Sequence, residues 1–174
     1  MEFNKENFTI LIDKVQFLKD EVKRYKYDFL TGLKLRKDFD SYLSTLFERY
    51  TFEHKNFLLV LIDIDNLHMV NREFGFEAGD NLIRDTSLKI ENLFQDCISS
   101  EIFRIGGDEF GILLKEYQIP ALEERLLSLP DCTWGYSTCC IHEDEIFSQQ
   151  QLFKMTDAKI IAKKLLNGDR RNNK

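Results

Sequence analysis

Two short acidic stretches have the residue types and spacing for metal-assisted phosphate chemistry. Asp63 and Asp65 come at the end of the apolar run 57–62, and the sequence GGDE, residues 106–109, lies between two further apolar runs. Alternate residues of a β-strand point to the same face, so the two aspartates should lie together. Carboxylate oxygens bind hard cations such as Mg2+. A metal that bridges phosphate oxygens is a common device for phosphoryl and nucleotidyl transfer.

Each stretch also has a simpler explanation when it is taken alone. Glycine and aspartate are favoured in tight hairpin turns, so GGDE by itself indicates little more than a turn. Asp65 could cap a following helix, whereas Asp63 follows a buried run, where a carboxylate without a function is costly. If the hairpin neighbours the Asp63 strand, Asp63 and Asp108 can share one metal. Gly106 and Gly107 would then leave backbone N–H groups free to approach a phosphate.

The composition is that of a folded domain that does not bind a nucleic-acid polymer. The 174 residues are 43% hydrophobic and carry a formal net charge of −6, whereas polymer binding needs an excess of Lys and Arg. A small anionic ligand remains open, because a divalent metal can neutralise it locally. No apolar run is long enough to span a membrane and the N-terminus lacks signal-peptide features, so we expect no membrane insertion and a cytoplasmic location.

The four cysteines are predicted to be free thiols. Cys97, Cys132, Cys139 and Cys140 form no CxxC pair, and the three histidines have no metal-ligand spacing near them. Zinc and a structural disulfide are therefore not expected.

The N-terminal segment has the pattern of an amphipathic helix with a heptad seam. Between residues 8 and 25, apolar side chains recur at alternating spacings of three and four, which is the coiled-coil spacing. The pattern covers about two and a half heptads, fewer than the three to four that indicate a coiled coil. Three interpretations stay open: a dimerising helix, one helix packed on its own domain, or a fragment that stays frayed. The seam consists of Phe8, Leu11, Val15, Leu18, Val22 and Tyr25.

The rest of the chain alternates helical and strand patterns that would position the acids. The run 57–62 is continuously apolar and rich in branched residues, which predicts a central strand buried on both faces. The order of elements indicates an α/β (α+β) sandwich around a mostly antiparallel sheet of about five strands, flanked by helices. We expect helices at 39–50, 66–74, 80–94, 120–129 and 152–165, strands at 57–62, 101–105, 110–114 and 132–140, and a loose polar tail from residue 167.

Three motifs resemble those of the GGDEF family, the diguanylate cyclases. IGGDEFGILL, residues 105–114, resembles the signature hairpin of that family. DFLTGLKLRKDF, residues 28–39, resembles its N-terminal motif, and DIDNLHMVNREFGFEAGD, residues 63–80, resembles its strand–helix motif. The motifs occur in the family's order and cover most of the chain beyond the first helix. We therefore expect an N-terminal helix, a short coiled coil in one interpretation, at 1–27 and a GGDEF domain at 28–174.

The resemblance implies a fold like the palm of polymerases and nucleotidyl cyclases, with an active site formed by two domains. Such a homodimer condenses two GTP molecules into cyclic di-GMP and releases two pyrophosphates, with Mg2+ or Mn2+ as the cofactor. The alternative is a catalytically weak or silent GGDEF domain that binds a nucleotide or a protein partner. We expect no further domain in 174 residues, so regulation would come through the helix, the oligomer or a separate regulatory protein.

The resemblance also implies roles for individual residues. Two acids and one carbonyl match the metal ligands, and the second acid of the hairpin matches a residue that binds metal or activates the ribose 3′-hydroxyl. An amide and a carboxylate match the pair that reads guanine, whose carbonyl, ring N–H and amino group they can satisfy. In this chain the metal ligands are Asp63, Asp108 and the Ile64 carbonyl, the second acid is Glu109, the guanine readers are Asn71 and Asp80, and Gly106 and Gly107 allow the triphosphate to approach.

The chain departs from the family pattern at several positions. His68, which is mostly neutral at pH 7, replaces a phosphate-facing lysine, and Leu35 stands where asparagine is usual. Cys97 and Ser100 stand in place of the Arg and Asp of a product-inhibition site, so no inhibitory site is expected unless a partner provides one. The C-terminal basic residues are out of the usual register, and either phosphate binding or a solvated helix end is open for them. These residues are Lys163 or Lys164 and Arg170 or Arg171.

Overall fold

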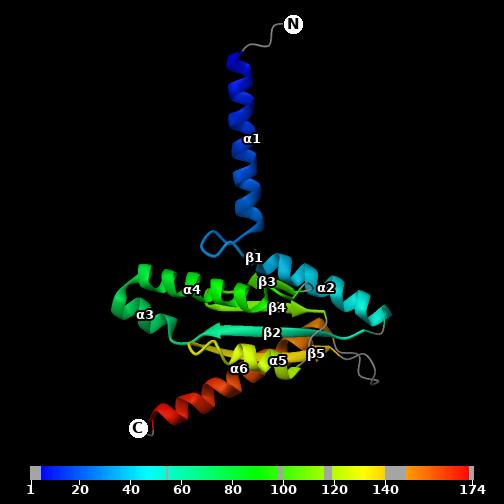
Figure 1. The fold of residues 1–174 in the computed structure, drawn as a ribbon, viewed down its shortest axis with the longest axis vertical. Coiled ribbons are helices and arrows are strands. Elements are labelled where there is room, and N and C mark those ends of the chain that lie inside the picture. The colour runs from blue at the N-terminus through cyan, green and yellow to red at the C-terminus, as the bar shows by residue number, and fades with distance from the viewer. Residues whose placement is uncertain (1–4, 54, 98–99, 116–118, 140–147, 173–174) are drawn as a thin grey trace.

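The computed structural model describes residues 5–53, 55–97, 100–115, 119–139 and 148–172. A five-stranded sheet forms the middle of the molecule, helices cover its faces, and the N-terminal helix projects from one end (Figure 1). The predicted sandwich with an N-terminal helix is confirmed. The elements are α1 (Lys5–Lys26), β1 (Lys34–Leu35), α2 (Arg36–Glu53), β2 (Phe57–Ile64), α3 (Leu67–Phe74), α4 (Phe76–Phe94), β3 (Ser100–Arg104), β4 (Glu109–Leu114), α5 (Ile119–Leu126), β5 (Cys132–Cys139) and α6 (Gln149–Asn172).

The sheet is mostly antiparallel, as predicted, with the strand order β1-β3-β4-β2-β5. Strand β2 pairs antiparallel with β4 on one side and β5 on the other, and β3 pairs antiparallel with β4. Within the described sheet, only β1 runs parallel to its neighbour, β3. Strand β1 is two residues long, too short to leave a periodic pattern in the sequence, and no predicted range included it.

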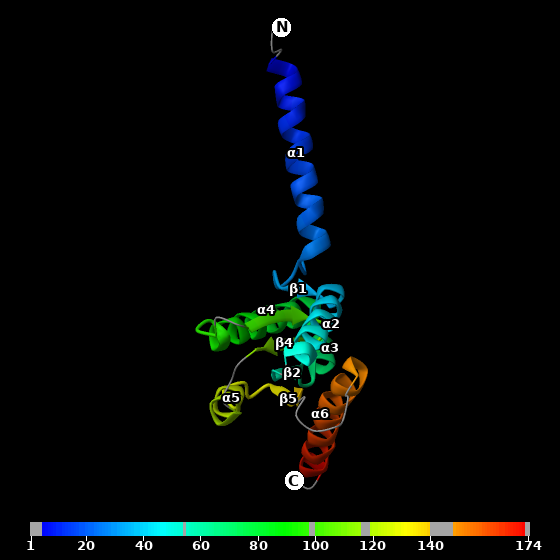
Figure 2. The same ribbon diagram turned by 90° about the vertical axis from the view of Figure 1, so that its right-hand side faces the viewer.

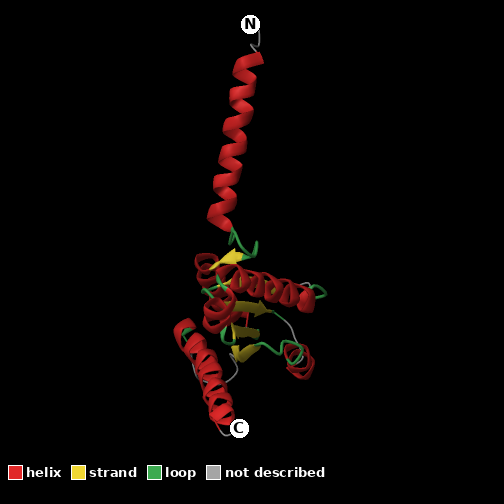
Figure 3. Cartoon of the chain, turned by 90° about the vertical axis from the view of Figure 1, so that its left-hand side faces the viewer, coloured by secondary structure: helices red, strands yellow, loops and turns green. Residues whose placement is uncertain are grey.

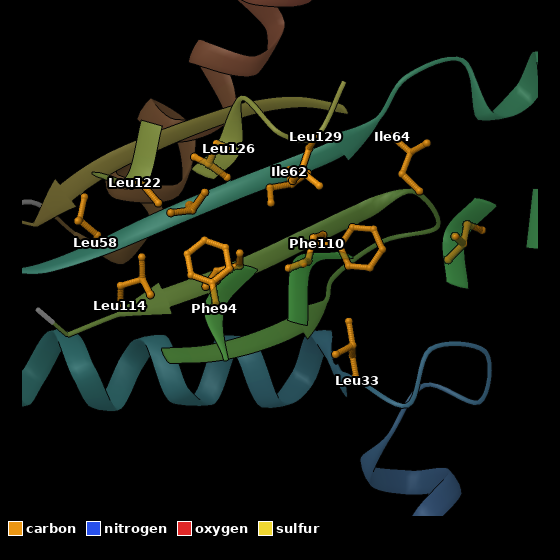
Figure 4. Close-up of a cluster of buried hydrophobic side chains, with 14 of the residues drawn as sticks. Leu33, Leu58, Ile62, Ile64, Phe94, Phe110, Leu114, Leu122, Leu126 and Leu129 are labelled. Atoms are coloured by element: carbon orange, nitrogen blue, oxygen red, sulfur yellow. The ribbon is translucent and has the colours of Figure 1, made fainter. Parts of the chain in front are cut away.

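Both faces of β2 are buried, which explains its uninterrupted apolar sequence. Alternate side chains of the strand enter two separate cores. Helices α4 and α5 cover one face, and α2 and α6 cover the other (Figure 2). The first core contains Leu58 and Phe94 (Figure 4), and the second contains Leu59 and Phe39. Asp63 continues the second series along the strand, so its carboxylate belongs to the face covered by α2 and α6.

Helix α1 is separate from the domain that follows it. It points away from the sheet in different views (Figure 1, Figure 3), and its six seam side chains are 44% to 70% exposed. The predicted helix is confirmed. Its seam side chains are exposed, although the centre of the Tyr25 ring lies 4.7 Å from the Lys37 Nζ atom of α2, and pairing of the seam with a second copy stays a prediction. An exposed apolar stripe on a helix is typical of a surface that packs against a partner.

Several predicted helix ends differ from the structure by three residues or more, among them ends of α4, α5 and α6. Helix α4 begins at Phe76 rather than at residue 80, because the chain turns at Gly75, which has a positive φ of 86°. Helix α5 ends at Leu126, since the N–H groups of Ser128 and Leu129 bond to carbonyls three residues back and form turns. Helix α6 continues to Asn172, so the tail predicted to be loose is helical through that residue. A single glycine, Gly168, weakens a helix without ending it.

The sequence favours buried thiols for the cysteines, and among the three that the structure describes Cys139 is buried whereas Cys97 and Cys132 are half-buried. Cys97, Cys132 and Cys139 form no disulfide, and Cys140 lies outside the described residues. Burial raises the pKa of Cys132 to about 12, so this thiol stays protonated at neutral pH.

Candidate active site

The end of β2 and the turn between β3 and β4 lie side by side. Pairing of β2 with β4 sets Asp63 opposite Glu109, and the Ile64 N–H donates to the Asp108 carbonyl oxygen over 2.9 Å. A metal shared by Asp63 and Asp108 requires the hairpin to neighbour the Asp63 strand, and the hairpin does so. The carboxyl groups of Asp63, Asp108 and Glu109 are close enough to repel one another. The predicted acids are therefore brought to one place at the edge of the sheet.

These carboxyl groups lie in a partly buried setting with an excess of negative charge. Burial raises the pKa of Asp63, although contact with Lys164 opposes the rise. The charges of Asp108 and Asp65 raise it further. Burial also raises the pKa of Glu109, and Asp63 and Asp108 add to the effect. A site of this charge with only oxygen donors suits a hard divalent cation.

Lys164 of α6 is the cation that meets the acids. Its ammonium group contacts the carboxylate of Asp63, a side chain that is mostly buried. Among the described side chains, no three His, Cys, Asp or Glu residues already form a metal-binding group. Asp63 therefore has an ammonium partner where the resemblance implies a metal, and the oxygen donors nearby fit Mg2+ or Mn2+ in type.

The structure distinguishes the two candidate lysines of α6. The Lys163 Nζ atom lies 3.2 Å from the centre of the Trp134 ring, which packs against the first core, and burial lowers the pKa of this lysine. Lys164 reaches the acids, whereas Lys163 turns toward the opposite face of the sheet. The side chains of Arg170 and Arg171 lie outside those that the structure describes.

Asp65 has a partner of its own on β5. The Thr133 hydroxyl donates to both Asp65 carboxylate oxygens, over 2.8 and 3.0 Å, and Thr133 pairs with Asp63 across β2 and β5. The two aspartates therefore share a face, as predicted. The capping alternative is not observed, because Asn66 occupies the N-cap position of α3 and makes no side-chain cap hydrogen bond. We assign Asp65 the role of joining β2 to β5 beside the site.

The two glycines of the turn differ in the space around them and in their hydrogen bonds. The Gly106 N–H donates to the Glu109 carbonyl oxygen over 3.2 Å, so the prediction that it is free for a phosphate is wrong. A Cβ on Gly106 would lie 2.4 Å from the Glu109 Oε2 atom, so glycine here leaves room for that carboxylate. At Gly107 the space for a Cβ is open. Approach of a phosphate to Gly107 stays a prediction, and the described residues leave the space beside it open.

An ion pair between Arg104 and Asp28 supports the turn, and sequence reasoning missed it. The Arg104 guanidinium donates to Asp28 Oδ1 over 2.8 Å and to the Gly107 carbonyl oxygen over 2.7 Å. The Arg104 and Asp28 side chains are only 13% and 12% exposed. Asp28 also accepts hydrogen bonds from the N–H and the hydroxyl group of Thr31. The segment that follows α1 is thereby linked to the turn beside the acids.

The candidate guanine-reading residues lie where α3 meets α4. Asn71 belongs to α3, and its carboxamide lies against Gly79 of α4. Asp80 follows Gly79 directly, so the structure brings Asn71 and Asp80 close together. His68 lies one turn before Asn71 on α3 and has an exposed side chain.

Comparison with known protein families shows the family to which this chain belongs. Residues 25–129 match a family model described as diguanylate cyclase, GGDEF domain. The chain belongs to the GGDEF family. The matched range contains the acids at the end of β2, the pair Asn71 and Asp80 where α3 meets α4, and the whole β3–β4 hairpin of this GGDEF domain.

Solved GGDEF domains have the same fold as this one. The coiled coil and GGDEF domain of DgcB from Caulobacter crescentus, in complex with c-di-GMP, matches with a TM-score of 0.76 at 19% identity and 91% coverage of each chain. The diguanylate cyclase SiaD from Pseudomonas aeruginosa, in complex with its activator SiaC, matches with a TM-score of 0.71 at 22% identity, covering 91% of this chain and 67% of that one. The expected palm-like fold is confirmed.

The curated relatives are longer than this GGDEF chain. It is 35% identical over 102 residues to uncharacterized membrane proteins of Staphylococcus aureus, including those of strains USA300 and NCTC 8325. The match covers 56% of this chain and 28% of each relative's length. Within the described part of the chain, no helix has both the length and the apolarity needed to cross a bilayer.

Replacing Arg104 with methionine should destabilise this GGDEF domain. Burial alone would raise the pKa of Asp28, but hydrogen bonds from Arg104 and Thr31 lower it below its ordinary value. Without the guanidinium a mostly buried carboxylate loses its charged partner, so we expect the free energy of unfolding to fall by about 1–3 kcal/mol in urea denaturation. Arg104→Met should be much less harmful in an Asp28→Asn background. Equal losses in both backgrounds would contradict the pairing.

Replacing Glu109 with glutamine should stabilise the fold at neutral pH. Burial, Asp63 and Asp108 raise the pKa of Glu109, so the folded state holds this proton more tightly than the unfolded state does. Stability is therefore lost as the pH rises from the ordinary Glu value, about 4, through the raised one. Glu109→Gln avoids that loss, and we expect a gain of about 1 kcal/mol or less at pH 7 that disappears near pH 4.

Denaturation of the wild type and of Glu109→Gln at several pH values measures this difference in stability. The exposed Glu91 on α4 provides the control, because Glu91→Gln should change stability little at any pH. A Glu109→Gln variant that is less stable than the wild type at pH 7 would show that favourable contacts stabilise the Glu109 carboxylate more than the neighbouring acids destabilise it.

Proposed function

We propose that this chain is a diguanylate cyclase that condenses two GTP molecules into cyclic di-GMP and releases two pyrophosphates. The observation that carries the proposal is the register that sets Asp63 beside Glu109, with Asp108 in the adjoining turn. Three neighbouring carboxyl groups, of which Asp63 and Glu109 have raised pKa values, are a costly arrangement, and membership of the GGDEF family gives it a use. Perturbed acids at an exposed sheet edge are typical of functional sites.

In this proposal Asp63, Asp108 and the Ile64 carbonyl oxygen hold Mg2+ or Mn2+. The bound ion would supply charge neutralisation for the triphosphate. Gly107 would allow a phosphate to approach the turn, and Lys164, already beside the acids, would offer a second positive charge to phosphate oxygens. Arg170 would add to that charge if its side chain reaches the same place.

Glu109 is the proposed proton acceptor. Its raised pKa brings it nearer to neutral pH than an ordinary glutamate, which favours general-base catalysis. The 3′-oxygen of one GTP bonds to the α-phosphorus of the other while the bond from that phosphorus to the bridging oxygen breaks. Pyrophosphate leaves, and Glu109 takes the hydroxyl proton. The ring closes when the two nucleotides exchange roles: the remaining 3′-oxygen bonds to the other α-phosphorus and the second pyrophosphate leaves.

The two GTP molecules would be held by two copies of the chain. Each copy would bind one guanine through Asn71 and Asp80, with His68 at the rim of the site. Each 3′-hydroxyl must then lie in line with the α-phosphate on the other copy, so most of the catalysis is positioning. The exposed seam of α1 is the surface that we propose brings the two copies together. Because the substrate is GTP, we place this activity in the cytoplasm.

The alternative function is a silent GGDEF domain that binds a nucleotide or a regulatory protein. It is favoured by the ammonium group of Lys164 on Asp63 and by His68 at a position where the family has lysine. SiaD, a GGDEF protein of similar fold, was solved with an activator, SiaC. A separate regulatory protein is therefore a reasonable partner for this chain in either case.

Incubation with GTP and Mg2+, followed by chromatography of the nucleotides, separates the two functions. The cyclase should form cyclic di-GMP with two pyrophosphates for each cyclic product and should leave ATP unchanged. A protein that retains GTP at equilibrium but forms no product at any protein concentration would be the binding module. A protein that neither binds nor converts GTP would contradict both.

A further inference from the structure

Gly79 of α4 and Asn71 of α3 are in unusually close contact. A Cβ on Gly79 would lie 1.8 Å from the Asn71 Oδ1 atom and 2.8 Å from its Cγ atom, distances that no pair of atoms can keep. The Asn71 Oδ1 atom is buried and accepts no hydrogen bond from the described residues. The carboxamide of Asn71 therefore occupies the space that a side chain at residue 79 would fill.

The carboxamide of Asn71 has one buried end, the Oδ1 atom, so Nδ2 is the end that remains to meet a ligand. The Oδ1 atom is turned into the protein, and the Nδ2 atom lies farther from Gly79, at 3.3 Å from the position of a Cβ. Nδ2 is a hydrogen-bond donor. Guanine presents acceptors at O6 and N7, whereas adenine has an amino donor in place of O6. A carboxamide that offers Nδ2 to a base would therefore favour guanine over adenine.

The backbone gives no other reason for glycine at residue 79. Gly79 lies inside α4, where alanine is the better helix former. Among the described glycines, only Gly32 and Gly75 have a positive φ, so residue 79 does not need the conformational freedom of glycine. The contact with Asn71 is what excludes a larger residue.

We propose that Gly79 is a positioning residue that sets base specificity by holding Asn71 with its amide donor outward. The inference rests on the proposed GTP site. An added methyl group would meet the end of a flexible side chain, so the Asn71 carboxamide would rotate away while the helix keeps its backbone. Gly79→Ala should therefore act on base recognition and leave the fold intact.

Calorimetric binding of 3′-deoxy-GTP and 3′-deoxy-ATP in the presence of Mg2+ tests the proposal, because neither analogue carries the attacking hydroxyl. In Gly79→Ala the preference for the guanine nucleotide should fall by about tenfold, the effect of one lost hydrogen bond. The melting temperature should stay equal or rise, as expected for alanine in a helix. In GTP turnover the KM should rise more than kcat falls.

A double-mutant cycle and a matched control isolate the contact. Asn71→Ala alone should lose the same preference, and Gly79→Ala should have no further effect in that background. Asn81→Ala is the control on the same helix, because the Asn81 side chain is exposed and bonds only to Arg84 among the described residues. That variant should keep the wild-type preference.

The outcomes separate this inference from the function on which it rests. A wild-type protein that binds both analogues equally would overturn the guanine site itself. A wild-type protein that prefers guanine, with a Gly79→Ala variant that is equally selective, would overturn the role of Gly79 alone. If Gly79→Ala melts at a lower temperature, the Asn71→Ala variant decides, because wild-type selectivity without the amide would contradict the proposal.

Discussion

Asp108→Asn should abolish the formation of cyclic di-GMP and leave the fold unchanged. Loss of one carboxylate from a metal-binding set removes charge stabilisation that only the transition state uses fully, so we expect a loss of about 10³-fold or more in turnover. The fold should survive because the backbone carbonyl of Asp108, and not its side chain, accepts the hydrogen bond from the Ile64 N–H. Product chromatography measures the turnover, and circular dichroism with a melting curve measures the fold.

Asp40→Asn is the matched control for this change. Asp40 is also an aspartate with a charged partner, but it pairs with Arg36 on the exposed surface of α2. Such surface pairs contribute little to stability, so the control should retain wild-type turnover and melting temperature. Wild-type turnover in Asp108→Asn would contradict the assignment of the hairpin acids.

Deletion of residues 1–26 should make activity strongly dependent on protein concentration. The six seam side chains of α1 are exposed in a single copy, and we propose that a second copy covers them. Tethering two domains through such a helix pair gives an effective concentration in the millimolar range. At about 1 µM protein, the truncated form should therefore lose about 100-fold or more in specific activity and recover much of it as its concentration approaches that range.

Point substitutions in the full chain separate the seam from the rest of the helix. Leu18→Asp places a charge in the seam and should reproduce the loss, with a smaller species in sedimentation. Lys19→Asp changes the charge of the neighbouring residue outside the seam, and it should leave both activity and mass unchanged. Specific activity that is independent of concentration in the truncated protein would contradict the dimerising role.

Local patterns in the sequence predicted the central elements of the fold. The uninterrupted apolar run of β2 predicted a strand covered on both faces, and the glycines of GGDE between two apolar runs indicated a hairpin. Pairing of the hairpin with β2 then places Asp63 beside Glu109. The strand and the hairpin depend on residues that are close in sequence, so the sequence contains that information directly, whereas their pairing was a condition that only the structure could meet.

Contacts between distant segments could not be predicted in the same way. Arg104 and Asp28 stand next to recognisable motifs, but nothing in either motif indicates that the two side chains meet across 76 residues. Lys164 is separated from Asp63 by 101 residues, and only the packing of α6 decides that it, and not Lys163, faces the acids. The two-residue strand β1 is likewise defined by its partner β3.

Backbone hydrogen bonds in the turn also could not be predicted from the sequence. GGDE allowed either glycine to offer its N–H to a phosphate, and the actual geometry commits that of Gly106 to the Glu109 carbonyl. The contact between Gly79 and Asn71 is a similar case, since the sequence shows a glycine in a helix without showing what fills the space beside it.

The central claim, an active site formed by two copies of this chain, is tested most directly by mixing wild-type protein with Asp108→Asn. The two are equilibrated at a fixed total concentration, and the initial rate of cyclic di-GMP formation is measured against the wild-type fraction. Closing the ring needs two intact half-sites, so the account predicts that the rate falls as the square of that fraction. A rate that falls in simple proportion, or no cyclic product even from the pure wild-type protein, would contradict it.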